Sequence, residues 1–563
     1  MMLHFGGDVN RSTAEKWPHL RRTAAWLAVA ATAAVWAAVL VRFPGPAVTD
    51  PDGHASALYM ERIAHGQRLE EPLLSTPKPL LTLTHGLAWT LTHDWRAVTL
   101  LTILAFGVAV TSLAAAARTV GGVPAALATL VAMAGSGPLI LQVARGNSVV
   151  WALAGWGVAL AALADRDHRR WPLAGAALLA AGLARTETWL LLPLVALFAW
   201  FAWRRGTRAS CWLLLAFAAP VLWLAHDYLL TGDPLWSSRI PVRYTDLIAG
   251  RAVVPPTAWA AEVARRYAAQ PFLLALSLAG AAWLATRRAW LALTATSAVA
   301  ILVLTLLGWY AAQGVYISFR YFDPADLAVR LLAALGAAAL ATFATTATTR
   351  LLRPVPQQAP RRERAPAHLV DVTPAGRPTS AAPSPDVPGP EPAPQSVAAR
   401  ADRSSPMVPT AVASALACLA VAATTWPVAP VDPLVDSTLD RDTRLSANAA
   451  TAIEALRPFA AAGQPITVSG PQRVRVALAL DRPLGQVHDL FLDTLHTPLD
   501  QALSNSRAVY HDADGDRPPN RFAALTRATP GAVGPLRLHP IRTDPATGLY
   551  VFRIEKVEVP SPP

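Results

Sequence analysis

The sequence predicts a polytopic α-helical membrane protein of about eleven spans, with a small extracytoplasmic α/β domain at its carboxy-terminal end. Of the 563 residues, 53% are hydrophobic and only 15% are charged, and the mean hydropathy is +0.33. Long apolar runs recur as far as residue 427, and beyond it helical and strand patterns alternate. This composition is typical of a chain that lies in lipid, because soluble domains carry more charge.

Apolar stretches recur at lengths that suit a bilayer core of about 30 Å, for which a helix needs about 20 residues. No small-residue cleavage site follows the first stretch, so we expect it to remain as a signal anchor. The stretch 172–184 measures only roughly 20 Å at about 1.5 Å per residue, so it is predicted to be tilted or partly buried by protein. The eleven predicted spans are 23–41, 97–117, 123–143, 148–164, 172–184, 188–203, 210–230, 272–286, 289–309, 324–346 and 408–427.

Arginines gather in short connections that alternate along the chain, and they set the predicted orientation. Lys and Arg are enriched in cytoplasmic loops, so these connections and the amino-terminal residues 1–22 are predicted to be cytoplasmic, in the plasma membrane of a bacterium. Residues 42–96, 231–271 and 310–323 then lie outside. Topology explains the net charge of +12, and no nucleic-acid partner is predicted. The arginines are Arg21, Arg22, Arg118, Arg166, Arg169, Arg170, Arg204, Arg205, Arg208, Arg287 and Arg288.

Changes in composition divide the chain into domains. Residues 23–349 form the predicted membrane domain, and 408–427 form the last span. Between them, 350–407 is predicted to be a disordered cytoplasmic linker, because its proline, serine and arginine cannot build a core. Residues 428–563 form the extracytoplasmic α/β domain. Its predicted elements are a helix at 445–462 and strands at 465–470, 473–480 and 548–559.

The sequence gives little sign of a metal or a disulfide. The two cysteines, Cys211 and Cys418, lie in apolar segments and are predicted to be small buried hydrophobes. The segment HDADGD at 511–516 has a misplaced glycine for an EF-hand and Ala523 where an acid is needed, which favours a solvated turn. No cofactor is therefore predicted, although the acidic pair described next could recruit a divalent metal.

The first outer loop holds polar groups whose positions solubility alone does not explain. Asp50 and Asp52 stand where the chain leaves an apolar helix, and Lys78, one of only three lysines, precedes Pro79 where the chain re-enters. Carboxylates near hydrocarbon tend to be functional or paired, because they cost up to about 2.5 to 3.5 kcal/mol at the bilayer centre. The two acids could instead simply cap the helix that is predicted to begin near Ala55.

Further polar groups are expected at the same depth of the membrane. Arg185 and Glu187 interrupt an apolar stretch, and Arg320 and Tyr321 precede another span. The alternative for the first two is an interfacial salt bridge, and for Arg320 it is ordinary snorkelling within an aromatic belt. A lysine such as Lys78 can act as a point charge for phosphate.

Five short motifs lie on the predicted outer side: Asp50-Pro51-Asp52, STPKPLL at 75–81, GLARTE at 182–187, TGDPL at 231–235, and Arg320-Tyr321 with Pro324. In order and sidedness they resemble GT-C membrane glycosyltransferases, among them aminoarabinosyl, arabinosyl and mannosyl transferases. The resemblance covers roughly residues 23–346. Thr186 replaces the proline of the family's Leu-x-Arg-Pro-Glu stretch, and Trp236 stands where a proline is common, so the subfamily stays open.

The resemblance implies a fold, a reaction and roles for single residues. It implies an inverting transfer from a polyprenyl-phosphate-linked sugar donor, in contact with membrane lipids, to a glycan, lipid or protein acceptor outside. Asp52 or Asp50 would act as the general base, and Lys78, Arg185 and Arg320 would bind the donor phosphate. Such donors need no metal to bridge a pyrophosphate. The other candidate site residues are His54, Glu187, Tyr321 and Asp233.

Two other classes stay open at this point: a polytopic membrane transporter and a non-catalytic envelope-assembly protein. Transporters tend to carry inverted repeats and charges near the midplane, whereas the polar residues here cluster at one face beside long outer loops. An intact acidic pair speaks against a scaffold without function in catalysis. The sequence therefore favours the enzyme.

Overall fold

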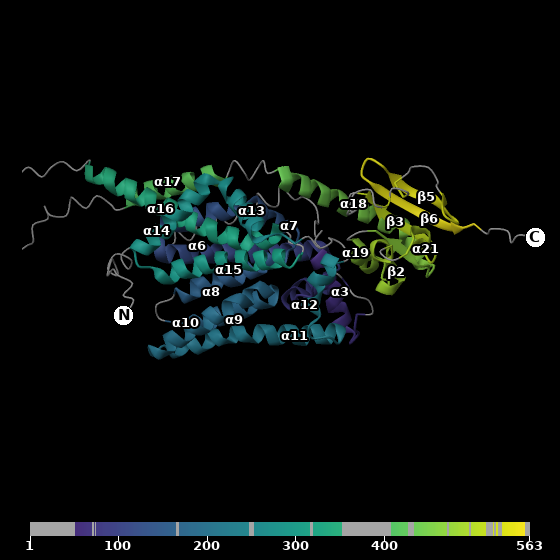
Figure 1. The fold of residues 1–563 in the computed structure, drawn as a ribbon, viewed down its shortest axis with the longest axis horizontal. Coiled ribbons are helices and arrows are strands. Elements are labelled where there is room, and N and C mark those ends of the chain that lie inside the picture. Colours follow the sequence, from purple (N-terminus) through teal and green to yellow (C-terminus); the bar gives the residue numbers. More distant parts are fainter. Residues whose placement is uncertain are drawn as a thin grey trace, which may run out of the picture.

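The computed structural model describes residues 51–69, 73, 75–164, 168–246, 253–315, 319–351, 407–425, 433–469, 472–494, 497–513, 522, 525–526 and 532–557. The predicted span 23–41, Asp50 and residues 352–406 of the predicted linker lie outside the described residues. Figure 1 shows a long bundle of helices with a smaller domain of helices and strands at one end.

Many helices of the bundle begin with a proline or with a polar capping residue. Proline stands in the first turn of α4, α7, α9, α10, α13 and α14, where its fixed φ suits a helix and its missing N–H costs nothing. Asn147 caps α8 by accepting a hydrogen bond from the Val149 N–H. The elements are α3 (Pro51–Ala64), α4 (Pro79–Leu81), the π-helix η1 (Thr82–Gly86), α5 (Leu87–Thr92), α6 (Trp95–Ala134), α7 (Gly137–Ala144), α8 (Ser148–Leu163), α9 (Trp171–Ala184), η2 (Thr186–Leu191), α10 (Leu192–Arg204), η3 (Arg208–Phe217), α11 (Ala218–Thr231), α12 (Trp236–Tyr244), α13 (Pro256–Ala268), α14 (Pro271–Thr286), α15 (Trp290–Ala312), η5 (Phe319–Phe322), α16 (Asp323–Leu351) and α17 (Met407–Thr425).

Several of these helices are long and apolar enough to cross a membrane, which indicates an integral membrane protein. Among the described residues there are five, or seven if each of two bent pairs is one span. The pairs are α7 with α8, bent by 115°, and α13 with α14, bent by 94°. The predicted count of eleven is thus supported only in part. As predicted, the helix at 171–184 is shorter than a full span, and Ala174, Ala181 and Ala184 on it are buried.

The predicted span 123–143 is wrong as a single helix. It consists of the second part of α6 followed by α7, and the interruption falls at Gly135 and Ser136, directly before Gly137 and Pro138. Glycine weakens a helix and proline cannot continue one from the preceding turn, so the apolar run breaks there.

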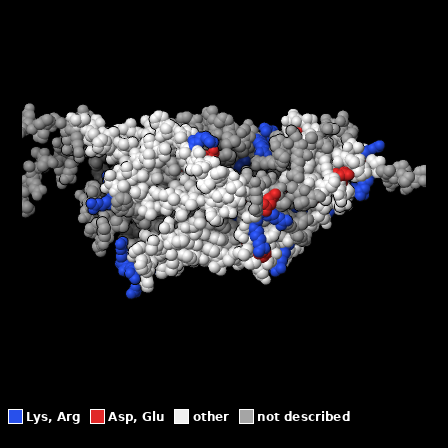
Figure 2. All heavy atoms as spheres, viewed as in Figure 1, with Lys and Arg blue, Asp and Glu red and all other residues white. Residues whose placement is uncertain are grey.

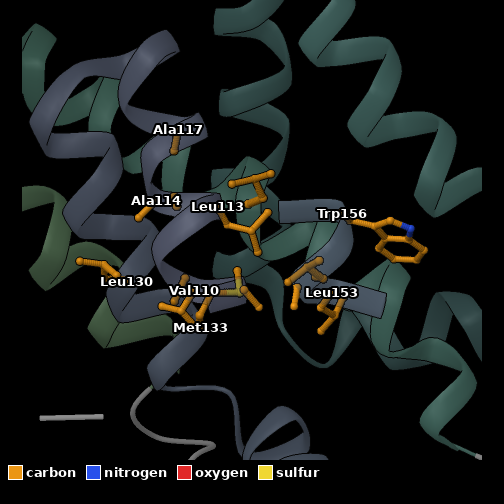
Figure 3. Close-up of a cluster of buried hydrophobic side chains, with 14 of the residues drawn as sticks. Val110, Leu113, Ala114, Ala117, Leu130, Met133, Leu153 and Trp156 are labelled. Atoms are coloured by element: carbon orange, nitrogen blue, oxygen red, sulfur yellow. The ribbon is translucent and has the colours of Figure 1, made fainter. Parts of the chain in front are cut away.

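A glycine also divides the 40-residue helix α6. Gly122 has φ 71° and ψ −163°, a conformation that favours glycine, so α6 consists of two helical segments. Side chains of both segments belong to one large buried cluster, to which α8 contributes Leu153. Figure 3 shows Val110 from the first segment close to Met133 from the second. The boundary between the predicted spans 97–117 and 123–143 therefore falls where it was expected.

The carboxy-terminal domain has one mixed six-stranded sheet, in the order β2-β1-β3-β6-β5-β4. Strand β1 pairs parallel with β2 and β3, and the other neighbours are antiparallel. The predicted strands at 465–470 and 548–559 are confirmed as β1 and β6. The elements are α18 (Pro433–Ala461), β1 (Ile466–Val468), α19 (Arg473–Ala479), η8 (Leu484–Gln486), β2 (Val487–Asp489), α20 (Leu490–Asp493), α21 (Leu499–Leu503), β3 (Ala508–Asp512), β4 (Ala532–Val533), β5 (Leu536–Asp544) and β6 (Leu549–Lys556).

The predicted strand at 473–480 is wrong, because this segment is the helix α19. The alternation of arginine with valine suggested a strand with one solvent-facing and one buried face. However, four successive side chains are buried: Arg473, Val474, Arg475 and Val476. Arg473 Nη2 donates to the Leu484 carbonyl at 3.0 Å, which satisfies the buried guanidinium. A parallel pair such as β1 and β2 requires a crossover, usually a helix, and α19 is that crossover.

The prediction of a solvated turn at 511–516 is also wrong where the segment is described. Asp512 is 1% exposed at the end of β3, where its Oδ2 accepts hydrogen bonds from Asn448 and Tyr510, each at 3.0 Å. These two hydrogen bonds make burial of the carboxylate tolerable, and the Asp512 backbone N–H donates to the Ser469 hydroxyl. Asp514 and Asp516 lie outside the described residues.

Charge marks the two ends of the helical bundle. Figure 2 shows a broad uncharged band over the helices, with arginines at one end and mixed charges at the end near α3. The carboxy-terminal domain joins that second end, where α19 contacts α3 and α18 contacts α7. The candidate site lies at this junction.

Candidate active site

Helix α3 places Asp52 at the start of a thoroughly buried segment. Pro51 begins the helix, and an acid in the first turn interacts favourably with the helix dipole. Residues 52–59 are all buried. The Ser56 hydroxyl donates to the Asp52 carbonyl at 2.7 Å, which ties down the same turn. The helix begins at Pro51, four residues before its predicted start near Ala55, and Asp52 lies in its first turn.

The carboxylate of Asp52 is held by two partners from one loop. Its Oδ2 lies 2.7 Å from Lys78 Nζ, and its Oδ1 accepts a hydrogen bond of 2.6 Å from the Ser75 hydroxyl. The side chains of Asp52 and Lys78 are only 8% and 11% exposed, so water screens the ion pair weakly. Lys78 Nζ also donates to the Thr76 carbonyl at 3.2 Å. A carboxylate and an ammonium group thus share one enclosed position.

The loop 75–78 is itself fastened from two sides. From α3, the Tyr59 hydroxyl donates to the Ser75 carbonyl at 2.7 Å. Burial, with Asp52 nearby, raises the pKa of Tyr59 far above its usual value, so this hydroxyl stays a donor. From α12, the Ser237 hydroxyl lies 3.5 Å from the Pro77 carbonyl and 2.8 Å from Asp227 Oδ1.

A second polar pair lies close to the first. Arg185 makes two hydrogen bonds to Glu187, of 3.1 and 2.6 Å, and its guanidinium carbon lies 5.3 Å from the ring centre of Tyr321. The expected alternative of a salt bridge between Arg185 and Glu187 is therefore present. Lys78 lies within electrostatic reach of Glu187, and Tyr310 is near both members of this pair. Five predicted site residues thus gather at one end of the bundle: Asp52, Lys78, Arg185, Glu187 and Tyr321.

The remaining predicted site residues do not add to this group. His54 packs edge-on against Trp95, with ring centres 4.7 Å apart. Asp233 pairs at 2.6 Å with the largely exposed Arg239. The side chain of Arg320 and all of Asp50 lie outside what the structure describes.

Sequence reasoning missed four residues that hold the site: Tyr59, Ser75, Asp227 and Ser237. Asp227 offered a signal, because it is an acid within an otherwise apolar stretch and such residues are rarely without a task. Ser75 lies within the quoted STPKPLL motif, three residues before Lys78. Tyr59 and Ser237 offered no signal in the sequence, since their importance depends on which backbone carbonyls the fold brings near them.

The π-helix η1 packs against α3. His85 Nε2 accepts a hydrogen bond from Trp151 Nε1 at 3.1 Å and lies 3.1 Å from the Thr102 hydroxyl. Burial lowers the pKa of His85 to about 3, so the imidazole is neutral at pH 7. Next to it, Gly86 lets the backbone approach α3 closely, because a Cβ at this position would lie 2.7 Å from the Ser56 carbonyl and collide with Met60.

Gly86→Ala is therefore expected to lower kcat/KM about tenfold or more for any reaction in which Asp52 takes part. The added methyl group must push α3 or η1 aside, and small displacements of a reacting group are costly. Activity and thermal unfolding of the purified variant would be measured together. Leu87→Ala, at an adjacent and 44% exposed position, is the control and should resemble the wild type. Normal kcat/KM in Gly86→Ala would show that α3 need not be held this closely.

No group of three or more His, Cys, Asp or Glu side chains that could hold a metal occurs among the residues that the structure describes. The absence of a metal requirement stays a prediction. The chemistry that these residues offer is a carboxylate beside an ammonium group, with a fixed guanidinium nearby.

Comparison with known proteins identifies the fold. No family model and no curated protein matches the sequence. A crystal structure of ArnT from Cupriavidus metallidurans in the apo state is similar to the whole chain, with a TM-score of 0.50 and 14% sequence identity. The similarity covers 96% of this chain and 98% of that one. At this identity the likeness concerns the fold alone. The chain therefore has an ArnT-like fold.

Proposed function

We propose that this protein is a GT-C-type membrane glycosyltransferase that moves a sugar from a polyprenyl-phosphate donor to an acceptor outside the cytoplasm. The observation that carries the proposal is the enclosed contact of Asp52 with Lys78 and Ser75, at the end of a membrane helix bundle. The fold supports it, because the ArnT structure is similar over 96% of this chain, and the five sequence motifs resemble those of GT-C glycosyltransferases.

Asp52 acts as the general base in this mechanism. The acceptor hydroxyl oxygen attacks the anomeric carbon while its proton passes to the Asp52 carboxylate. The bond between the anomeric carbon and the phosphate oxygen breaks, and the electron pair leaves with the lipid phosphate. A single displacement from the opposite face inverts the anomeric configuration. A positioned base of this kind contributes about 10² to 10⁴ in rate.

Lys78 and Arg185 stabilise the departing phosphate. Lys78 has three rotatable donors on a flexible stem, so it can turn from Asp52 to a phosphate oxygen without leaving the site. Arg185 is fixed by its two bonds to Glu187, which gives a cation that needs no reorganisation as charge develops. Tyr321 covers the guanidinium face.

A transfer assay tests the function directly. Purified protein in lipid nanodiscs would be incubated with a panel of polyprenyl-phosphate sugars and bacterial envelope acceptors, and sugar transfer would be followed by mass spectrometry. We expect transfer from at least one donor, with release of the polyprenyl phosphate. Absence of transfer and of donor binding across the panel would count against the proposal.

The proposed orientation can be tested by cysteine labelling. In a variant that carries Cys211→Ser and Cys418→Ser, a single cysteine would be placed at Arg205 or at Asn505, both exposed. We expect an impermeant reagent to label Asn505→Cys in intact cells and Arg205→Cys only after lysis. The reverse pattern would place the carboxy-terminal domain in the cytoplasm.

A further inference from the structure

We propose that the carboxy-terminal domain is part of the catalytic unit, because it packs on α3 and fixes Asp52 through Tyr59. This inference rests on the proposed function and assigns a task to a domain outside the membrane. Tyr59 is a positioning residue here, since it acts on Asp52 only through Ser75. The domain is thereby more than a tethered accessory.

The contact between the domain and α3 is a continuous hydrophobic core. One buried cluster combines Ala55, Leu58 and Tyr59 of α3 with Val474 and Ala477 of α19 and with residues of α18, β1, β2 and β3. Tyr59 is 0% exposed and Ala477 is 1% exposed, so this is an interior and not a loose surface contact. The core of the domain and the buried face of α3 are one structure.

A second cluster extends this contact to the membrane bundle. Leu478 of α19 packs against a group that contains Ala57 of α3 with Trp95 and Val98 of α6. Helix α3 is therefore packed against α19 of the domain, against η1, α5 and α11, and against Trp95 and Val98 of α6. A helix of 14 residues is only marginally stable alone in water, so packing of this kind determines its position.

Tyr59 connects this interface to the reactive carboxylate. Its ring lies in the shared core, whereas its hydroxyl donates to the Ser75 carbonyl at 2.7 Å. Ser75 in turn donates its own hydroxyl to Asp52 Oδ1 at 2.6 Å. Two hydrogen bonds thus lead from the domain interface to the base. Phenylalanine would fill the same space in the core, so the hydroxyl of Tyr59 serves the loop and not the packing.

The test is Tyr59→Phe in the full-length protein, compared with Tyr550→Phe. Tyr550 is a buried tyrosine of β6 in the carboxy-terminal domain, stacked on Phe552 and distant in sequence from the loop 75–78. We expect Tyr59→Phe to lower kcat about tenfold with a smaller change in donor KM, because the base is less well placed while the donor site is intact. Tyr550→Phe should leave kcat unchanged.

The pH profile distinguishes positioning from mere stability. Loss of order in Ser75 weakens a hydrogen bond to the ionised carboxylate, so the acid limb of the kcat/KM profile should move to higher pH in Tyr59→Phe. Among the described residues, the charged groups near Asp52 and the loop include Lys78, Glu187, Arg185 and Asp227, and the substitution alters none of these four. Leu478→Ala, which loosens α19, should shift the limb in the same direction.

The outcomes separate this inference from the proposed function. If the wild type transfers sugar and Tyr59→Phe and Leu478→Ala both keep the wild-type kcat and pH profile, the domain has no positioning role. If kcat falls only in proportion to the folded fraction, with an unmoved pH profile, Tyr59 is structural and the inference is also wrong. If the wild type transfers nothing, the failure belongs to the proposed function.

Discussion

Asp52→Asn should lower kcat by about 10² to 10⁴, because the amide keeps the shape of the side chain but cannot take a proton from the acceptor. Donor binding should persist or become tighter, since Lys78 loses the carboxylate that it contacts at 2.7 Å. Single-turnover transfer and donor binding would be measured separately on purified protein in nanodiscs. Loss of turnover with donor binding intact is the expected signature of a missing base.

Two further variants make this experiment decisive. Asp233→Asn removes another acid, one paired with Arg239, and should behave like the wild type. Asp50→Asn tests the other member of the acidic pair. Loss only in Asp50→Asn would exchange the roles of the two acids, and near-normal transfer in both variants would refute the mechanism.

Lys78→Ala is expected to have an effect of similar size but a different character. Removing a cation that meets the leaving phosphate should cost about 10² to 10³ in kcat. Donor binding should weaken as well, because the contact with phosphate exists before and during the reaction. Binding would be measured with the donor and with the free polyprenyl phosphate, which separates recognition of phosphate from recognition of sugar.

The controls for Lys78 distinguish a phosphate contact from support of Asp52. Lys78→Ala also leaves a buried carboxylate without its cation, so thermal unfolding must be recorded beside activity. Lys78→Arg keeps the charge and should recover part of the binding. Should Lys78→Ala bind the donor as the wild type does while kcat collapses, Lys78 would serve Asp52 alone.

The fold was largely predictable because lipid imposes a simple rule on sequence. Long apolar runs and alternating arginines predicted a helical membrane protein, and the stretches 148–164 and 324–346 correspond to α8 and α16. The error at 473–480 has a different cause. A buried Arg473 with carbonyl partners looks, in sequence, like a solvent-facing residue of a strand. Contacts with distant carbonyls cannot be read from local spacing.

The candidate site was predictable in its charged residues and not in its supports. Asp52, Lys78 and Arg185 stand out because charge near hydrocarbon requires a reason. Tyr59 and Ser75 carry no such mark, because a tyrosine and a serine are ordinary at a helix and in a loop. Their roles arise when the fold brings the Tyr59 hydroxyl to a carbonyl 16 positions further along the chain. Hydrogen bonds of this kind depend on the three-dimensional fold and cannot be read from the sequence.

The contact of Lys78 with Asp52 also bears on the order in which substrates add. The ammonium group of Lys78 lies 2.7 Å from the Asp52 carboxylate, and a carboxylate paired with a cation takes a proton poorly. A donor phosphate competes for the same ammonium group, so its arrival releases the carboxylate when a sugar is in place. We therefore expect ordered kinetics with the donor as leading substrate. Until the donor binds, the paired carboxylate therefore activates neither water nor an acceptor hydroxyl.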